Sequence, residues 1–444
     1  MVTNLSEGKV NSVLWKFTIP MFISVVFQQL YNIADSAIAG KFAGEPALAA
    51  VGASYPITMI FMAIAIGSNV GCSVVISRYF GGGELRKMKT AVTTTLIGVG
   101  VLSLLLTGMG FLISSPLLRL MNTPTDIFNE GKWYLNIYIA GLVFLFLYNV
   151  ATGIFTSLGD SKTPLMFLIG SSIGNIALDL LFVVKFGWGV RGVGWATFIA
   201  QGIACVLALF TLKKRIRGIP SGEGKNVIFS FKMFRRIAMI AIPSILQQSF
   251  VSVGNLFIQG LVNSFGSGVL AGYSAAVKLN NFAITSFSTL GNGVSNFTAQ
   301  NLGAGKTDRV KKGFRSGCLL AWMIAAAFMI AFLVFGRELM SLFLEDTAGT
   351  AMDTGLIYLR ILAPFYIAVP VKLVADGVLR GSSEMKCFMM TTFSDLILRV
   401  VLAFWFSRIW GSTGIWLAWP VGWVISMVMS LAFLRKVYGK INQS

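Results

Sequence analysis

The chain has 444 residues, of which 55% are hydrophobic and only 12% are charged, and its mean hydropathy is +0.77. A water-soluble fold of this composition would expose large apolar patches, so these values exclude a soluble globular domain and indicate a protein that crosses a lipid bilayer. The formal net charge of +19 would suggest a nucleic-acid partner in a soluble protein. Without a soluble domain, we expect no nucleic acid to bind.

Long apolar stretches follow one another along the whole chain, separated by short polar or basic breaks. A transmembrane helix needs about 20 apolar residues. The first stretch follows a polar segment and lacks a signal-peptide cleavage site, so we interpret it as a retained helix. The sequence predicts an all-α, polytopic membrane protein with twelve transmembrane helices, at 12–38, 47–77, 90–113, 133–157, 164–184, 192–212, 236–263, 270–300, 316–335, 355–379, 387–407 and 414–434.

The basic residues predict how the chain is oriented in the membrane. They gather in runs such as LKKRIRG (212–218), FKMFRRI (231–237) and KTDRVKK (306–312). If both termini lie in the cytoplasm, these runs all fall on the cytoplasmic side, as the positive-inside rule requires. We therefore predict a multi-pass protein of the cell (inner) membrane with both termini inside. The basic inner surface also suits anionic lipid headgroups.

Several kinds of chemistry have no residues to support them in this sequence. The chain has no histidine, which removes histidine-based hydrolysis, zinc protease motifs and haem ligation. No phosphate-binding GxxxxGK[ST] loop is present, so direct drive by ATP is not expected. The four cysteines fall singly inside predicted helices, without metal-ligand spacing. We expect no catalytic residues and no resident cofactor, and therefore no enzyme.

Two segments far apart in the sequence repeat each other. GCSVVISRYFGGGELRKMK begins at residue 71 and GVSNFTAQNLGAGKTDRVK at residue 293, an offset of 222, and GVRGVGWATF at 189 repeats as GSTGIWLAWP at 411. Because each copy has an even number of helices, both copies have the same orientation and a central cavity is expected between them. The repeat predicts three regions: a six-helix bundle over 1–212, a cytoplasmic linker over 213–235 and a second six-helix bundle over 236–444.

Two of the four acidic residues in the predicted spans have basic neighbours on their own helix. Asp376 has Lys372 and Arg380 four residues away on either side. Asp395 has Arg399 four residues later. Side chains at this spacing share one helix face. We therefore predict that both acids are balanced by ion pairs.

The other two acids, Asp35 and Asp179, have no basic residue at these offsets. A lone charge inside the membrane costs several kcal/mol, so each needs a cation. That cation could be a proton, a sodium ion, a substrate ammonium group, or a Lys or Arg from another helix. Polar side chains recur at helical spacing around both acids and in the fourth predicted span, which favours an oxygen-rich cavity in the N-terminal half: Gln28, Tyr31, Asn149, Thr152, Thr156 and Asn175.

The motifs at 28–57 (QQLYNIADSAIAGKFAGEPALAAVGASYPI), 76–87 (ISRYFGGGELRK), 158–164 (LGDSKTP) and 175–179 (NIALD) resemble the multidrug and toxic compound extrusion (MATE) family. The resemblance covers the whole chain. An aspartate in the first helix, with no acid in the seventh, is most similar to the DinF-like branch. The resemblance implies a V-shaped pair of bundles, alternating access, and secondary active efflux of organic, mostly cationic compounds in exchange for inward Na⁺ or H⁺. We expect a monomer.

The family motifs also suggest roles for particular residues. Asp35 resembles the coupling carboxylate, and Asn175, Asp179 and Thr197 resemble the other ligands of the cation site in the N-terminal lobe; oxygen donors of this kind suit Na⁺. Three positions match the family's substrate chamber, and a methionine offers a deformable wall beside them: Gln28, Tyr31, Asn149 and Met59. The repeat aligns Asp35 with Asn255, and Asp179 with Arg399, so the sequence does not predict an equivalent second cation site.

Two other functions remain open at this point. A flippase for lipid-linked precursors would share the duplicated layout, but such proteins usually have more helices and a basic cavity for phosphates. A membrane-embedded enzyme such as an intramembrane hydrolase would need a convergent nucleophile and base, which a chain without histidine scarcely offers. Neither alternative explains the two unbalanced carboxylates.

Overall fold

The computed structural model describes residues 3–43, 45–121, 123–220, 227–344 and 349–443. Over these ranges the chain is almost entirely helical and contains no β-strand. The prediction of an all-α fold is therefore confirmed.

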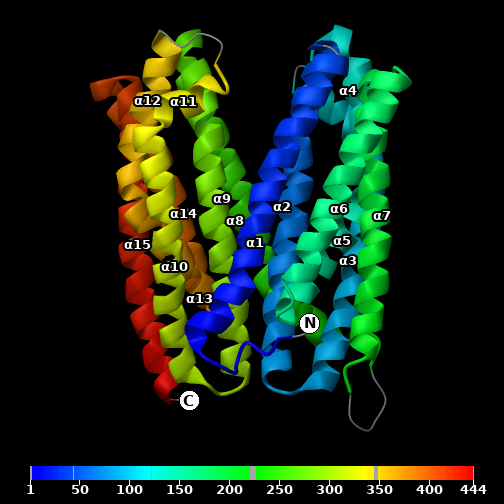
Figure 1. Ribbon diagram of the computed structural model, residues 1–444, viewed down its shortest axis with the longest axis vertical. Coiled ribbons are helices and arrows are strands. Elements are labelled where there is room, and N and C mark those ends of the chain that lie inside the picture. Colours follow the sequence, from blue (N-terminus) through cyan, green and yellow to red (C-terminus); the bar gives the residue numbers. More distant parts are fainter. Residues whose placement is uncertain (1–2, 44, 122, 221–226, 345–348, 444) are drawn as a thin grey trace. The chain divides into compact units, whose positions relative to one another are not determined.

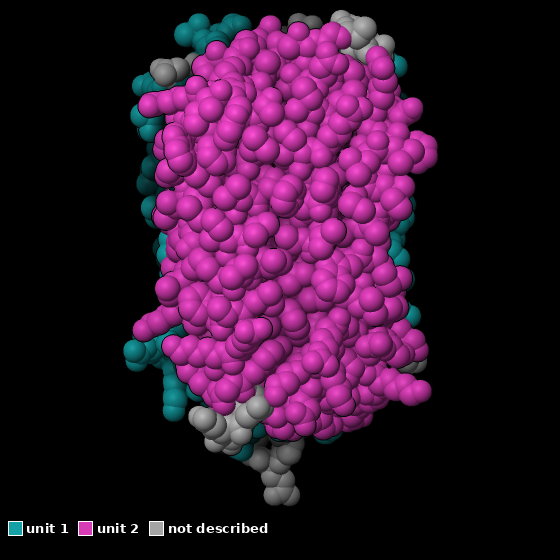
Figure 2. Space-filling model, turned by 90° about the vertical axis from the view of Figure 1, so that its left-hand side faces the viewer, with its two compact units in different colours: residues 1–3, 23–246 teal, residues 4–22, 247–444 magenta. Residues whose placement is uncertain are grey.

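The chain packs into two compact units. Unit 1 comprises residues 1–3 and 23–246, and unit 2 comprises residues 4–22 and 247–444; Figure 2 distinguishes them by colour. Two of the three borders fall inside long helices, α1 (Val10–Ile38) and α8 (Phe231–Asn263), and each of these two lies close to a helix-internal proline, Pro20 or Pro243. This grouping by packing differs at the borders from the predicted regions 1–212, 213–235 and 236–444, which remain a prediction from the sequence duplication.

Unit 1 consists of helices that run back and forth along one direction (Figure 1). Besides parts of α1 and α8, its elements are η1 (Ala39–Ala43), α2 (Glu45–Gly81), α3 (Leu85–Leu120), α4 (Thr125–Ala140), α5 (Leu142–Ser157), α6 (Lys162–Asp179), η2 (Leu180–Lys185) and α7 (Gly189–Arg217). The C-terminal ends of α2 and α7 lie at the same end of the unit as the N-terminal end of α3 (Figure 1). We call this the basic end of unit 1, because it carries Arg78, Arg86, Lys87, Lys89, Lys213, Lys214, Arg215, Arg217, Lys232, Arg235 and Arg236.

Unit 2 has a corresponding series of helices around an aromatic core. Its elements are the remainder of α1 and α8 with α9 (Ser267–Gly303), α10 (Thr307–Val334), α11 (Gly336–Ser341), α12 (Thr350–Leu362), η3 (Ala363–Ile367), α13 (Ala368–Gly381), α14 (Met385–Trp410) and α15 (Ser412–Gln443). Tyr358 and Trp416 are fully buried in the core, with ring centroids 5.2 Å apart. The small residues of α9 and α13 let these two helices approach closely, since a Cβ on Gly377 would lie 2.2 Å from the backbone oxygen of Gly291.

Each of the twelve predicted spans coincides with a helix or a helix pair. Ten described helices are long and apolar enough to cross a membrane, and the bent pair α4 and α5 makes an eleventh span. The twelfth prediction, 270–300, lies in α9, a helix of 37 residues that carries more polar side chains than the others. The fold is thus a polytopic helical membrane fold, as predicted.

Three predicted spans are not continuous α-helices, and one of them, 164–184, passes from α6 into the π-helical η2. The span 133–157 bends by 46° between α4 and α5, where the N–H of Gly141 is shared between the carbonyl groups of Ile137 and Tyr138. The span 355–379 contains the tighter 3₁₀ turn η3, which includes Pro364. Proline has no N–H to continue an α-helical ladder, which explains the change of helix type at this position.

Both unbalanced acids of the N-terminal half lie directly before a wider helical turn. Asp179 is the last residue of α6 and is followed by the π-helical η2, while Asp35 lies three residues before the end of α1, which continues as the π-helical η1. A π-helical turn loosens the backbone ladder and is frequent at functional sites. The two π-helical turns therefore make the surroundings of Asp35 and Asp179 a candidate functional site.

Candidate functional site

The candidate site lies in unit 1 around Asp35 of α1 and Asp179 of α6. Asp179 has no exposed surface, and the two carboxyl groups are near enough to interact directly. Neither oxygen of Asp179 has a hydrogen-bond partner, and nor does Oδ1 of Asp35. No basic side chain is paired with either acid among the described ion pairs. Because a buried, unpaired carboxylate is costly, the pair presents a strong demand for a cation or a proton.

A hydrogen bond joins the two helices that carry these acids. Tyr31 Oη donates to Asn175 Oδ1 over 2.6 Å, from α1 to α6. Tyr31 also lies beside Thr197 of α7. Tyr31 and Asp35 are one helical turn apart, as are Asn175 and Asp179, so each helix presents one neutral polar group and one carboxylate to the same region.

The structure thus brings together five predicted residues, namely Tyr31, Asp35, Asn175, Asp179 and Thr197. This grouping makes a set of carboxylate, amide and hydroxyl oxygens that suits Na⁺ as well as a proton. Over the described ranges, no group of three or more Cys, Asp or Glu side chains could hold a metal ion. A sodium ion at this position would therefore depend on the neutral oxygens as well as on the two acids.

Sequence reasoning missed a second layer of this site, formed by α4 and α7. Tyr134 lies close enough to both acids to interact with them electrostatically. A cavity of about 20 Å³, which is room for about one water molecule, lies next to it and is lined by Tyr134, Tyr138, Thr197 and Gln201, among others. The sequence contains a pattern that indicates this layer. Tyr134 and Tyr138, like Thr197 and Gln201, are polar residues four positions apart inside apolar helices, so each pair shares one helix face.

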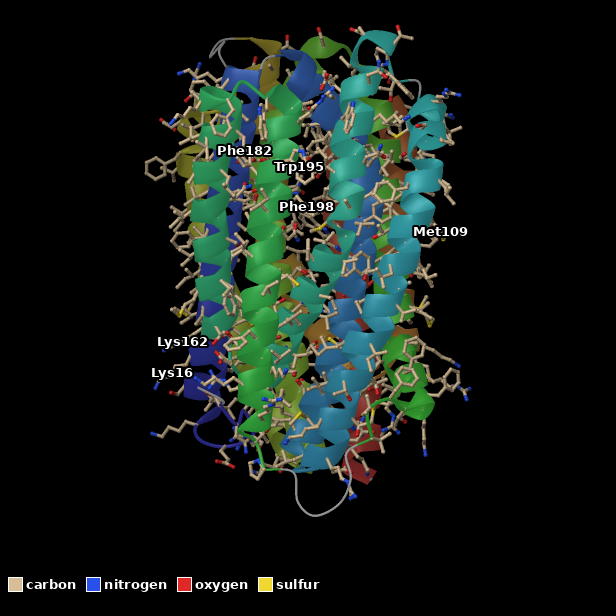
Figure 3. The ribbon with its side chains drawn as sticks, turned by 90° about the vertical axis from the view of Figure 1, so that its right-hand side faces the viewer. Lys16, Met109, Lys162, Phe182, Trp195 and Phe198 are labelled. Carbon is tan, nitrogen blue, oxygen red and sulfur yellow. The ribbon has the colours of Figure 1, made fainter. Side chains whose placement is uncertain are left out.

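Aromatic side chains of α7 pack around the same cavity. Phe198 lines it, and Trp195 packs edge-on against Phe198 with ring centroids 5.3 Å apart. Figure 3 shows both side chains on α7 in the half of unit 1 away from Lys162. Apolar aromatic rings thus adjoin the polar residues that line this cavity.

The remaining predicted substrate residues have other surroundings. Gln28 is exposed, whereas Met59 and Asn149 are half-buried. The Asn149 side-chain Nδ2 donates to Leu145 O of its own helix over 2.8 Å, and the backbone oxygen of Asn149 accepts from Asn69 Nδ2 at 2.9 Å. The contacts of Asn149 are thus made within α5 and α2, and a role in substrate binding stays a prediction for all three residues.

The polar stripe predicted in the fourth span has a structural explanation. The hydroxyl groups of Thr152 and Thr156 donate to carbonyl oxygens three residues earlier, over 2.7 Å and 2.9 Å. Threonine commonly satisfies its hydroxyl group in this way inside apolar helices. These bonds satisfy both hydroxyl donors and explain the stripe without a bound cation.

The acids of unit 2 are paired, as the sequence predicted. Lys372 Nζ lies 2.8 Å from Asp376 Oδ2, and Arg399 Nη2 lies 2.8 Å from Asp395 Oδ2. Arg399 also stacks over the ring of Trp419, with its guanidinium carbon 4.3 Å from the ring centroid. All four charged side chains are buried. The two units therefore differ, because the intramembrane acids of unit 2 are balanced by neighbours on their own helices and those of unit 1 are not.

Comparisons with known proteins agree with this architecture. The family model described as MatE matches the chain twice, over residues 20–181 and 243–405, which supports the predicted duplication. The chain is 29% identical to the "Probable multidrug resistance protein YpnP" of Bacillus subtilis, over 98% of this chain and 97% of that protein. It is 24% identical to the "FAD transporter" of Shewanella oneidensis, over 94% and 92% of the two chains.

Solved structures share the fold at low sequence identity. A transporter of the MOP superfamily from Pyrococcus furiosus, whose description reads "reverse polarity of binding pocket suggests different function", superposes with a TM-score of 0.93 at 21% identity over 99% of this chain and 98% of that one. An outward-facing multidrug resistance MATE family transporter superposes with a TM-score of 0.92 at 22% identity, over 100% of this chain and 99% of that one. The alternative of a membrane-embedded enzyme is thereby wrong: the chain belongs to the MatE family of multidrug efflux transporters.

Proposed function

We propose that this transporter exports organic cations in exchange for inward-moving Na⁺ or H⁺, and that the coupling ion binds at Asp35 and Asp179. The observation that carries the proposal is the set of three buried carboxylate oxygens without a partner. A transporter retains such costly groups where an ion or cargo neutralises them during the cycle. Asn175 and Thr197 complete the oxygen donors for Na⁺, whereas a proton needs the carboxylates alone.

Alternating access gives this site its function. Cargo and coupling ion must favour opposite states of the transporter, so that binding of one promotes release of the other. We place the cargo near Gln28, Tyr31, Asn149 and Met59, whose polar and deformable side chains suit varied organic cations. Tyr31 would then contact both the cargo and the ion site.

The orientation belongs to the same proposal. We place both termini and the basic end of unit 1 in the cytoplasm of a cell with the protein in its inner membrane, as the positive-inside rule favours. The transporter would act as a monomer and need no resident cofactor.

Anionic cargo is the alternative that two comparisons favour. One relative is named an FAD transporter, and FAD is an anion at neutral pH; one similar structure is described by the reversed polarity of its pocket. Two unbalanced acids argue for cationic cargo in this chain, because they would repel an anion. The flippase alternative also needs a basic cavity for phosphates, and the family match disfavours it.

Transport by purified protein in liposomes tests the proposal. An imposed Na⁺ or pH gradient should drive movement of ethidium, and Asp35→Asn or Asp179→Asn should abolish the gradient-driven part. Glu130→Gln is the matched control, since Glu130 is a partly exposed acid of the same unit that lies 4.0 Å from Arg191. Gradient-driven movement of FAD without movement of ethidium would replace the proposal with the anionic alternative.

A further inference from the structure

A separate pocket lies at the basic end of unit 1, away from the two acids. Its volume is about 740 Å³, within the usual range of ligand sites, and it is lined by Tyr79, Gly83, Glu84, Leu85, Arg86, Lys87, Thr90, Val227, Ser230, Lys232, Met233 and Arg236. Among the described lining residues, four are basic and one is acidic. All of them belong to unit 1, from the ends of α2, α3 and α8 and the segment before α8.

The backbone adds to the positive potential of this pocket. Two long helices begin at its wall, α3 at Leu85 and α8 at Phe231. Arg86, Lys87 and Lys232 lie in the first turns of these helices, where the helix dipole is positive and anions are favoured. Neither helix has an acidic residue in its first turn. Cationic side chains and helix N-termini thus converge on one space, which favours an anion there.

Tyr79 holds part of this basic group in place. Arg236 donates a hydrogen bond to Tyr79 Oη, and its guanidinium carbon lies 5.8 Å from the Tyr79 ring centroid. Lys87 Nζ lies 5.9 Å from the same ring and is paired with Glu84. The carboxylate of Glu84 therefore balances Lys87, and Lys232 and Arg236 remain as basic side chains of the pocket without a carboxylate partner among the described ion pairs.

The internal duplication supplies a comparison within the same chain. At the offset of 222, Lys87 aligns with Arg309 and Val227 aligns with Leu5. In unit 2, Arg309 donates to the backbone oxygens of Leu5 and Gly8 over 3.2 Å and 2.7 Å, and Leu5 is completely buried. In unit 1, Val227 is 55% exposed. Backbone oxygens thus contact Arg309 in unit 2, whereas in the described part of unit 1 the aligned residues Lys87 and Val227 line a pocket.

The surroundings of the pocket indicate where its ligand comes from. The segment that leads into α8 exposes several large apolar side chains, namely Val227, Ile228, Phe229, Phe231 and Phe234. Apolar and aromatic side chains next to basic ones are typical of the level of lipid headgroups. Within the pocket, Leu85 and Met233 add apolar surface beside the basic residues.

We propose that this pocket binds the phosphate group of an anionic phospholipid, held by Lys232 and Arg236 between the N-terminal ends of α3 and α8. Basic pockets between transmembrane helices bind such headgroups. The apolar side chains at the pocket rim contact the acyl chains. The site is distinct from the acids at Asp35 and Asp179, and the proposal is independent of what the transporter exports.

Native mass spectrometry of the purified full-length protein tests this assignment, with cardiolipin, phosphatidylglycerol and phosphatidylcholine titrated separately. We expect the two anionic lipids to bind in preference to phosphatidylcholine. The double variant Lys232→Gln, Arg236→Gln should weaken anionic lipid binding at least about tenfold, because each basic residue near the membrane surface attracts anionic lipid. The control Lys213→Gln, Lys214→Gln removes the same charge from exposed positions of the same basic end outside the pocket and should bind like wild type.

Lys232→Gln alone keeps the hydrogen bond between Arg236 and Tyr79 and should still weaken lipid binding, so the test does not depend on the folding of the double variant. Inorganic phosphate distinguishes the source of the ligand. Weak competition by millimolar phosphate supports a lipid headgroup, whereas complete displacement of the lipid overturns the lipid and assigns the pocket to soluble phosphate compounds. Equal lipid binding by the pocket variants and the Lys213, Lys214 control would overturn the proposal entirely.

Discussion

Tyr31 and Asn175 are 144 residues apart in the sequence, yet the Tyr31 hydroxyl group donates a hydrogen bond of 2.6 Å to the Asn175 side-chain oxygen. The bond fixes α1 against α6 at the level of the two unpaired acids. It also occupies one lone pair of the Asn175 oxygen and leaves a second for a cation. The geometry of the acid pair therefore depends on a neutral hydrogen bond.

Tyr31→Phe tests this dependence. The substitution removes the hydroxyl group and leaves a buried amide oxygen without its donor, which costs about 1–3 kcal/mol. We expect a modest fall in the thermal midpoint and a roughly tenfold weaker response of transport to the Na⁺ or H⁺ gradient, since about 1.4 kcal/mol corresponds to tenfold. Gradient titrations in liposomes measure the second effect. An unchanged gradient response, with the same fall in stability, would limit Tyr31 to a structural role.

Asp35→Asn should abolish coupled export and leave the protein folded. The cost of burying this carboxylate is justified by the cation it binds, and an amide of the same shape removes both the cost and the function. Expression, a monodisperse size-exclusion profile and the thermal midpoint report on folding, while ethidium export from cells or liposomes reports on function. Glu130→Gln should export like wild type. Normal export by well-folded Asp35→Asn protein would contradict the proposed coupling site.

The acids of unit 2 should respond in the opposite way. Asp376→Asn strands Lys372 and Asp395→Asn strands Arg399, so each leaves a buried base without its 2.8 Å partner. Removing one member of a buried pair costs about 3–5 kcal/mol. We expect markedly lower thermal midpoints, measured on detergent-purified protein.

A paired substitution separates lost charge balance from lost packing in this test. Asp395→Asn with Arg399→Met removes both charges at once and should recover much of the stability lost in Asp395→Asn. Full thermal stability of the single variants combined with lost transport would show that unit 2, rather than unit 1, carries the coupling acids.

The sequence predicted these ion pairs and the site for the same physical reason. Apolar periodicity locates the membrane helices, and the spacing of four residues places Lys372 beside Asp376. The absence of such a neighbour singled out Asp35 and Asp179. Contacts between helices were beyond this reasoning, because periodicity says which face of a helix is polar but not which helix it meets. Tyr134 was missed for this reason, and Thr197 was found only through the family resemblance.

The bend and the 3₁₀ turn inside two of the predicted spans could not be predicted from the sequence either. Gly141 in the 46° bend and Pro364 in η3 are visible in the sequence, but glycine and proline also occur in continuous membrane helices. Pro56, for example, lies inside the continuous helix α2. Whether such a residue bends a helix depends on the neighbours that satisfy its backbone groups, and these are known only from the tertiary structure.

Close packing of α9 on α13 should make Gly377 intolerant of a side chain. A Cβ at this position would lie 2.2 Å from Gly291 O, a backbone atom that cannot move aside cheaply. We expect Gly377→Ala to cost about 1–3 kcal/mol through overpacking. Gly170→Ala is the control, because a Cβ on Gly170 meets no atom within 4 Å, and it should leave the thermal midpoint unchanged or slightly raised. Equal midpoints for the two variants would show that the helices are further apart than described.

Competition between cargo and coupling ion tests the mechanism itself. If the ion neutralises Asp35 and Asp179, the carboxylates lose their attraction for a cationic substrate, so raising Na⁺, or lowering pH if protons couple, should weaken equilibrium binding of ethidium. Linkage requires the substrate to weaken ion binding by the same factor. In Asp179→Asn one of the two acids is already neutral, and the ion should therefore have much less effect on substrate affinity.

Fluorescence titrations of purified protein at saturating and at zero ion concentration measure this difference, with Glu130→Gln expected to show the wild-type ion dependence. The comparison between Na⁺ and pH also identifies the ion, since a site of carboxylate, amide and hydroxyl oxygens serves either one. Coupling energies of 1–3 kcal/mol are typical, which corresponds to about 5-fold to 150-fold in affinity. Equal substrate affinity at both extremes of both ions would rule out direct antagonism at the two acids, because a ligand with no differential affinity for the two states cannot shift their equilibrium. Coupling would then have to act through the arrangement of the helices alone.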